Sequence, residues 1–189
     1  MKQDRSSSLA SALHGFLTDY LPRQRAVSVH TIHSYRDSLK LFLQFAAGKK
    51  ADPSQLTLEQ LTRERVTAFL QYLEANRRNT ASTRNVRLSA LHSFFRYVGA
   101  HYPEHLAAGQ RILSVPFKRT TLREVQHLEL SEVQSILRSI DRSRRHGHRD
   151  LVLLSLMFNT GARVSEVVGL QACDLSLGSG ANGVQPRFA

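Results

Sequence analysis

The sequence predicts a mainly α-helical protein made of two units that are joined by a basic linker. Glycine and proline are sparse, at 10 and 5 of 189 residues, and they fall between apolar stretches that recur at helical spacing. Four such stretches with short connections occupy most of residues 1–113, which favours a compact bundle of four to five helices. The helical pattern lapses at residues 114–125, where basic residues cluster. We therefore expect a linker there and a second unit at residues 126–189.

Each predicted helix of the first unit combines an apolar stripe with polar, glycine or proline end signals. The stripes pass through Phe16, Leu39, Leu70 and Leu91 and repeat every three to four residues. A shorter apolar stretch at residues 106–113 follows the fourth stripe. The expected ends are a serine cap and Pro22 for the first helix, Ser28 and Gly48 for the second, Asn76 for the third, and Ser82 or Thr83 and then Gly99 for the fourth.

The second unit has three helical signals and no sustained strand pattern. Ser131 and Gln134 have the spacing of a capping box at the start of the first of these helices. Residues 151–158 are apolar on every side, so this helix should be buried all round in a finished fold. The last helix is predicted from about Arg163 to Leu170. Three helices without a sheet would cover the apolar helix poorly, so we expect this unit to be only marginally ordered.

Composition and charge exclude several classes of protein. The 26 lysines and arginines exceed the 15 acids by 11, and the sequence pI is near 10.6, so a polyanionic partner is expected, with nucleic acid ahead of an anionic membrane surface. No uncharged apolar run approaches the roughly 18 residues of a bilayer span. Cys173 is the single cysteine, which excludes an internal disulfide and a cysteine-based zinc cluster. The polar stretch Met1–Ser8 has no apolar segment behind it, which predicts a cytoplasmic protein without a secretory signal.

The excess of positive charge is local. Residues 76–123 contain nine basic side chains against the single acid Glu104. Arg84 and Arg87 are three residues apart on the fourth helix and are expected to share a face, where they could enter a major groove and bind phosphate or guanine. The alternative is a solvated face that only aids solubility. We predict that double-stranded DNA binds to Arg84, Asn85, Arg87, Lys118 and Arg119.

A compact motif follows the apolar helix of the second unit. Thr160 and Gly161 are expected to form a turn, and Arg163 to open a helix at the end where backbone N–H groups favour an anion. An arginine held there by buried neighbours is a phosphate clamp, and Glu166, three residues on, could hold its guanidinium in one rotamer. The alternative is an ordinary ion pair on a surface helix.

The order of residues from Thr160 to Leu170, with Asp174, resembles the box around the first catalytic arginine of the tyrosine recombinases, the family that includes the phage integrases. A looser pattern in the first unit is similar to the helical, SAM-like core-binding domain of that family. Its residues are Thr31, Tyr35, Leu39, Phe42, Ser82, Thr83, Arg84, Asn85, Arg87, Leu88, Leu91, Phe94 and Phe95.

The resemblance implies a DNA clamp in which the bundle holds one side of a duplex and a catalytic domain holds the other. The second unit would then be the N-terminal part of an α+β catalytic domain. In the family, a tyrosine cleaves the strand through a phosphotyrosyl intermediate, without a metal ion, a nucleotide cofactor or a small-molecule substrate. The resemblance assigns the scissile phosphate to Arg163 and the orientation of that arginine to Glu166.

The family's remaining catalytic groups are expected after this arginine. The 26 residues from 164 to 189 contain no histidine, lysine, tryptophan or tyrosine, and all five tyrosines lie among the first 102 residues, where we expect them to pack in the core. We therefore expect a truncated recombinase of a mobile element that is inactive alone, and whether the chain is an enzyme stays open. The alternatives are a non-catalytic module that occupies recombination sites or modulates a full-length recombinase, and, less favoured, a helix-turn-helix regulator.

Overall fold

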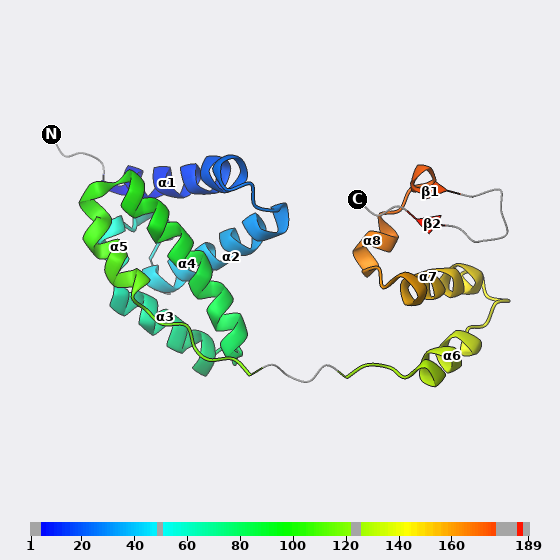
Figure 1. The fold of residues 1–189 in the computed structure, drawn as a ribbon. Coiled ribbons are helices and arrows are strands. Elements are labelled where there is room, and N and C mark those ends of the chain that lie inside the picture. Colours follow the sequence, from blue (N-terminus) through cyan, green and yellow to red (C-terminus); the bar gives the residue numbers. More distant parts are fainter. Residues whose placement is uncertain (1–4, 49–50, 122–125, 177–184, 187–189) are drawn as a thin grey trace. The chain divides into compact units, whose positions relative to one another are not determined.

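A computed structural model describes residues 5–48, 51–121, 126–176 and 185–186 (Figure 1). The chain divides into two compact units, Met1–Leu122 and Arg123–Ala189. The described elements are almost all helical, so the predicted fold class is confirmed. Of the described helices, none has both the length and the apolar character that crossing a membrane requires.

The first unit is a helical bundle. Its long helices are α1, α2, α3 and α4, and short helical segments connect them or follow them. In chain order the elements are α1 (Arg5–Gly15), η1 (Phe16–Gln24), α2 (Val29–Ala47), η2 (Pro53–Gln55), η3 (Leu58–Gln60), α3 (Arg63–Ala75), α4 (Ala81–His101), η4 (Pro103–His105) and α5 (Leu106–Leu113).

The ends of α2 are confirmed, whereas the predicted end of the first helix is wrong. The hydroxyl of Ser28 accepts the N–H of Thr31 at 3.3 Å and caps α2, which ends at Gly48 with φ of 79°. Helix continues past Pro22 to the end of η1, because the chain widens into a π-helix there. The N–H of Arg25 donates to the carbonyl of Tyr20, five residues back, as in a π-helix. Pro22, which has no N–H to donate, lies between these two residues.

Both predicted ends of α4 are wrong. The N-terminal cap is Thr80, whose hydroxyl accepts the N–H of Thr83 at 3.2 Å, and α4 begins before Ser82. At the other end, α4 runs through Gly99 to His101. Gly99 allows close packing inside the helix, because a Cβ atom there would lie 3.1 Å from the Cδ1 atom of Leu106 on α5.

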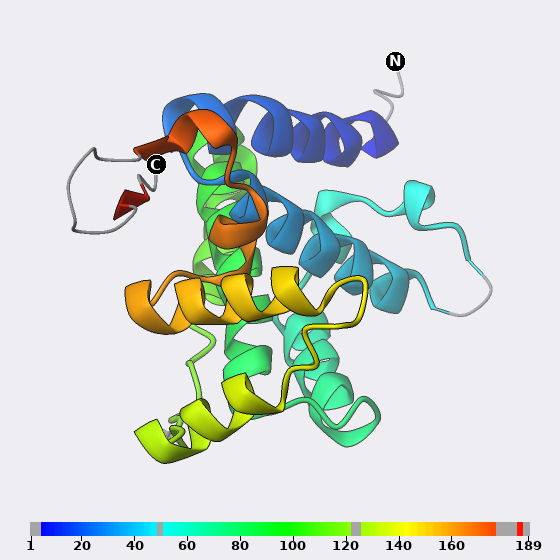
Figure 2. The same ribbon diagram turned by 90° about the vertical axis from the view of Figure 1, so that its right-hand side faces the viewer.

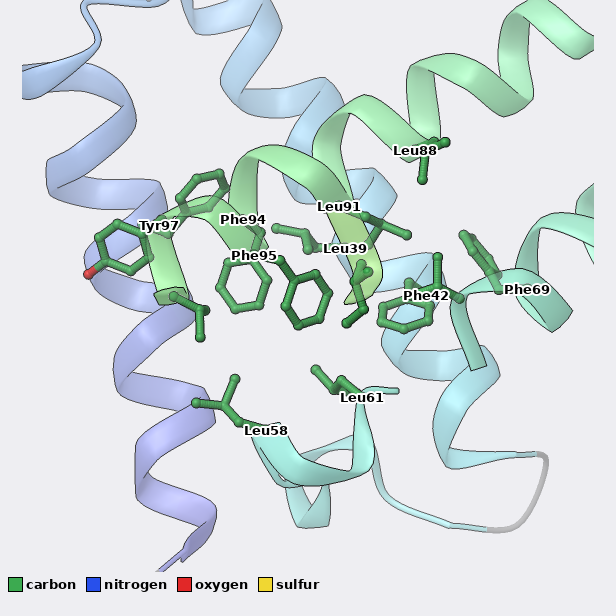
Figure 3. Packing of buried hydrophobic residues seen from close by; sticks show 14 of the residues in the cluster. Leu39, Phe42, Leu58, Leu61, Phe69, Leu88, Leu91, Phe94, Phe95 and Tyr97 are labelled. Atoms are coloured by element: carbon green, nitrogen blue, oxygen red, sulfur yellow. The ribbon is translucent and has the colours of Figure 1, made fainter. Parts of the chain in front are cut away.

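The core lies around α4. In both ribbon views α2 crosses α4 (Figures 1 and 2), and the buried side chains of α4 point toward η1, α2, α3 and η3 (Figure 3). The Phe16 and Phe94 rings meet edge to face at 5.4 Å, and the Phe42 and Phe69 rings lie 5.3 Å apart. All five tyrosines belong to this cluster or pack against it, as predicted: Tyr20, Tyr35, Tyr72, Tyr97 and Tyr102.

The second unit contains α6 (Leu130–Ser139), α7 (Gly147–Thr160), α8 (Val164–Val168), η5 (Ala172–Asp174) and a two-residue antiparallel pairing of β1 (Leu175–Ser176) with β2 (Gln185–Pro186). The predicted capping box of Ser131 and Gln134 is wrong by two residues. The carboxylate of Glu132 accepts the N–H of Glu129 at 2.8 Å, so Glu129 and Glu132 form the box.

The poor coverage expected for residues 151–158 without the rest of a finished fold is confirmed for part of α7. Val152 and Phe158 are 52% and 48% exposed, and Leu154 is exposed as well. Within the described part of the second unit, α7 packs against α6 and α8. Two short helices cannot surround a third, so one side of α7 stays open to solvent.

The core packing gives a first prediction. Val66→Ala should lower the free energy of unfolding of the first unit by about 2 kcal/mol, because Val66 is fully buried and a cavity would remain. The matched control is Val86→Ala on α4, where the valine is 47% exposed and the expected loss is below about 0.5 kcal/mol. Urea unfolding followed by circular dichroism measures both variants. Equal losses would contradict the described core.

Candidate nucleic-acid interface

Arg84 lies on the buried side of α4, contrary to the expected exposed face. Only 6% of the residue is exposed. Its Nη1 atom donates to the carbonyl of Pro116 at 2.9 Å and to the Oδ1 atom of Asn85 at 3.1 Å. Burial lowers the pKa of Arg84, and the carboxylate of Glu74 acts in the opposite direction. This guanidinium is therefore committed to the chain that follows α5.

Asn85 is committed to the same segment. Its Nδ2 atom donates to the carbonyl of Lys118 at 2.7 Å, and its Oδ1 atom accepts the N–H of Lys118 at 3.0 Å. One side-chain amide thus pairs both backbone groups of one residue. The Nζ atom of Lys118 donates to both carboxylate oxygens of Glu74 on α3, at 2.8 and 2.9 Å. Two more of the predicted DNA-binding side chains are therefore engaged within the protein.

Residues 115–118 together form a segment that we call the strap. Val115 is buried in the core cluster. The Phe117 ring meets the His92 ring edge to face at 5.2 Å, although Phe117 is 51% exposed. The strap lies within the predicted linker of residues 114–125, and it is attached to α3 and α4.

Arg87 bridges two helices. Its Nη1 atom donates to the hydroxyl of Ser38 on α2 at 2.9 Å, and that hydroxyl donates to the carbonyl of Ser34 at 2.6 Å. The side chain is half-buried, so part of it stays open beside the contact between α2 and α4. Unlike the guanidinium of Arg84, that of Arg87 bonds neither to the strap nor to Asn85.

Exposed arginines gather at the end of the bundle where α3 meets α4. Arg77 and Arg78 lie in the turn between these helices, and Arg119 directly follows the strap. Lys118 contacts the last turn of α3 and the second turn of α4. It therefore holds the next residue, Arg119, near the connection between these two helices. Arg77 and Arg78 belong to the nine basic residues of the acid-poor stretch 76–123. The available signal was a pair of arginines between two predicted helices, where side chains are exposed.

The arginine motif of the second unit has the expected ion pair, whereas Gly161 alone makes the expected turn, because Thr160 is still the last residue of α7. Gly161 ends α7 in the left-handed conformation, with φ of 68°. Glu166 accepts the Arg163 N–H at 2.8 Å and the Arg163 Nη1 atom at 3.1 Å, and these bonds lower the pKa of Glu166. However, the Arg163 side chain is 82% exposed, so buried neighbours do not hold it. It precedes α8, which has only five residues.

The two units define a class of protein in which a basic helical bundle is followed by an exposed arginine that a glutamate orients. The family model described as the phage integrase N-terminal SAM-like domain matches residues 7–101. The chain belongs to the tyrosine recombinase family. No solved structure matches it.

Relatives with curated names agree with this assignment. An integrase/recombinase of Sinorhizobium fredii, y4rC, is 41% identical over 179 residues, which cover 94% of this chain and 54% of the relative. The tyrosine recombinase XerD of Halalkalibacterium halodurans is 30% identical over 83% of this chain and 50% of its own. The tyrosine recombinase XerC of Pelobacter propionicus is 26% identical over 85% and 51%. The chain therefore spans about half the length of these relatives.

His92 gives a prediction of pH dependence. Burial lowers the pKa of His92, although its hydrogen bond to the Ile112 backbone opposes the shift. A histidine with a lowered pKa in the folded state stabilises the fold above its unfolded pKa of about 6.5, and this contribution is lost as pH falls through the folded value. We expect the midpoint of thermal unfolding to fall between pH 7 and pH 5, and to fall less in His92→Gln. An equal drop in both proteins would contradict this role.

Proposed function

We propose that this chain acts in site-specific DNA recombination, and that its first unit binds duplex DNA through the end of the bundle where α3 meets α4. The observation that carries the proposal is the exposure of Arg77, Arg78 and Arg119 there, in a member of a recombinase family. Exposed guanidinium groups bind backbone phosphates with little dependence on sequence. Arg87, further along α4 at the contact with α2, adds a half-buried donor.

The second unit contributes one phosphate-binding group in this proposal. A guanidinium has five N–H donors, and Glu166 accepts from the Nη1 atom of Arg163. With most of that side chain exposed, the rest of the guanidinium is open to a phosphate oxygen. Glu166 restricts its rotamers before the phosphate arrives, which lowers the entropy cost of binding. Arg163 would stabilise the charge that develops on a phosphate under attack.

The five tyrosines of this sequence are poorly placed to supply the attacking hydroxyl. Tyr97 is 7% exposed and burial raises its pKa, so its hydroxyl is a poor nucleophile. The other four tyrosines are half-buried against the same core. This observation favours a second candidate function, in which the chain occupies the recombination sites of a mobile element without cleaving them, or works beside a recombinase that supplies the tyrosine.

The salt dependence of DNA binding tests the first part of the proposal. If about five phosphates are contacted, log K should fall against log salt with a slope of about −4 to −5. The triple variant Arg77→Ala, Arg78→Ala, Arg119→Ala should bind a duplex oligonucleotide more weakly and lower the magnitude of that slope by about 3. Fluorescence anisotropy at several salt concentrations measures both quantities.

A charge-matched control separates a site from general attraction. Arg23→Ala, Arg25→Ala, Arg96→Ala removes the same three charges from exposed positions outside the α3–α4 turn. We expect its slope to stay near the wild-type value. If both triple variants lose the same affinity and slope, the proposed binding end is wrong.

Strand cleavage separates the two candidate functions. The 189-residue chain should leave supercoiled plasmid intact and form no covalent adduct with DNA, because Tyr97 lies in the core and the other four tyrosines are half-buried against it. Denaturing gels of protein incubated with labelled plasmid would reveal an adduct. A DNA-linked band that disappears in one of the five Tyr→Phe variants would identify a nucleophile and contradict this expectation.

A further inference from the structure

The strap is fastened by more contacts than an exposed connection of its length requires. Each of its four residues has its own partner: Val115 in the core, Pro116 with Arg84, Phe117 with His92, and Lys118 with Asn85 and Glu74.

The polar contacts of the strap are specific. The buried guanidinium of Arg84 donates a hydrogen bond to one strap carbonyl, and burying a charge without such a partner would lower the stability of the fold. Asn85 satisfies both the donor and the acceptor of one strap residue. Glu74 neutralises the lysine of that same residue. Three side chains from two helices thus converge on backbone and side-chain groups of only two residues, which fixes where this backbone runs.

We propose that Arg84, Asn85 and Glu74 are positioning residues, which set the point at which the chain leaves the bundle toward the second unit. This inference rests on the proposed function, in which both units hold the same DNA. The anchor of the second unit is then Lys118 and not Ser114, the first residue beyond α5. The number of residues between this anchor and the second unit limits which relative positions of the two units on a duplex are accessible.

Covalent geometry gives the size of the effect. From Lys118 to Glu129, the cap of α6, there are 11 residue steps, and from Ser114 there are 15. At about 3.5 Å per extended residue, the longest reach is about 38 Å with the strap attached and about 52 Å without it. The strap therefore shortens the reach by about 14 Å.

Trypsin reports whether the strap is attached. Cleavage after Lys118 requires its backbone to enter the protease, and Asn85 holds both of its backbone groups. In Asn85→Ala the rate of this cleavage should rise at least fivefold. Asn85→Asp keeps the acceptor for the Lys118 N–H and loses the donor to its carbonyl, so an intermediate rate is expected. Ser82→Ala, on the exposed first turn of α4, is the matched control and should cleave at the wild-type rate.

A distance measurement separates positioning from simple stabilisation. Cys173 is exposed and is the single cysteine, so one spin label goes there and a second on Gln44→Cys, an exposed position of α2. Double electron–electron resonance should give a broader distance distribution in Asn85→Ala, with a tail extended by up to about 7 Å, because Pro116 stays bonded to Arg84 and only the two residues after it are released, while thermal unfolding of the bundle stays unchanged.

The outcomes are distinguishable from those of the proposed function, because both measurements are made without DNA. Unchanged cleavage after Lys118, or an unchanged distance distribution, overturns the positioning role even if DNA binding is intact. Failure of the wild-type chain to bind duplex DNA overturns the proposed function and leaves the measured attachment of the strap standing.

Discussion

The burial of α4 among its neighbours is the constraint on which the rest of the first unit depends. This helix packs against α2, α3, α5 and η1, and nine of its residues are buried, Arg84 and His92 among them. Because so many elements cover α4, few of its side chains face solvent alone. Its polar residues bond inside the protein to the strap, to Ser38 and to the end of α5, although the Nε atoms of Arg84 and Arg87 and the Nε2 atom of His92 stay unpaired in the described part of the chain.

The helical pattern of the sequence correctly predicted several helix ends and buried faces that depend only on residues close together in the chain. The cap and end of α2 are where Ser28 and Gly48 indicated, and the stripe of α3 is buried as expected. The ion pair of Arg163 and Glu166 also follows from spacing alone, because a helix's N-cap residue and the residue three positions later lie close together. The predicted start of α4 was wrong for a local reason. Thr80, Ser82 and Thr83 can all cap a helix, and the sequence has no local signal that chooses among them.

The role of Arg84 was missed although a signal was present. Arg84 precedes Leu88, Leu91 and Phe95 by four, seven and eleven residues, so it lies in line with the apolar stripe and not beside Arg87. A charged residue on that stripe indicates burial with a partner. What the sequence could not supply is the partner, because Pro116 lies 32 residues further along the chain and meets Arg84 only when α5 packs against α4.

Counting charge along the sequence also overstated the charge available to DNA. The acid-poor window of residues 76–123 begins just after Glu74, and that carboxylate pairs with Lys118 from inside the window. Charge that is paired or buried contributes little to a phosphate-binding surface, so the effective site is smaller than the nine basic residues suggest. Arg77, Arg78 and Arg119 retain their exposure. At physiological ionic strength charges act over about 8 Å, so three arginines close to one turn act together where nine scattered along the chain would not. The strap connects the packing around α4 with the DNA-binding charge. Its contacts take Lys118 out of that charge, and the same contacts hold Arg119 beside the exposed arginines.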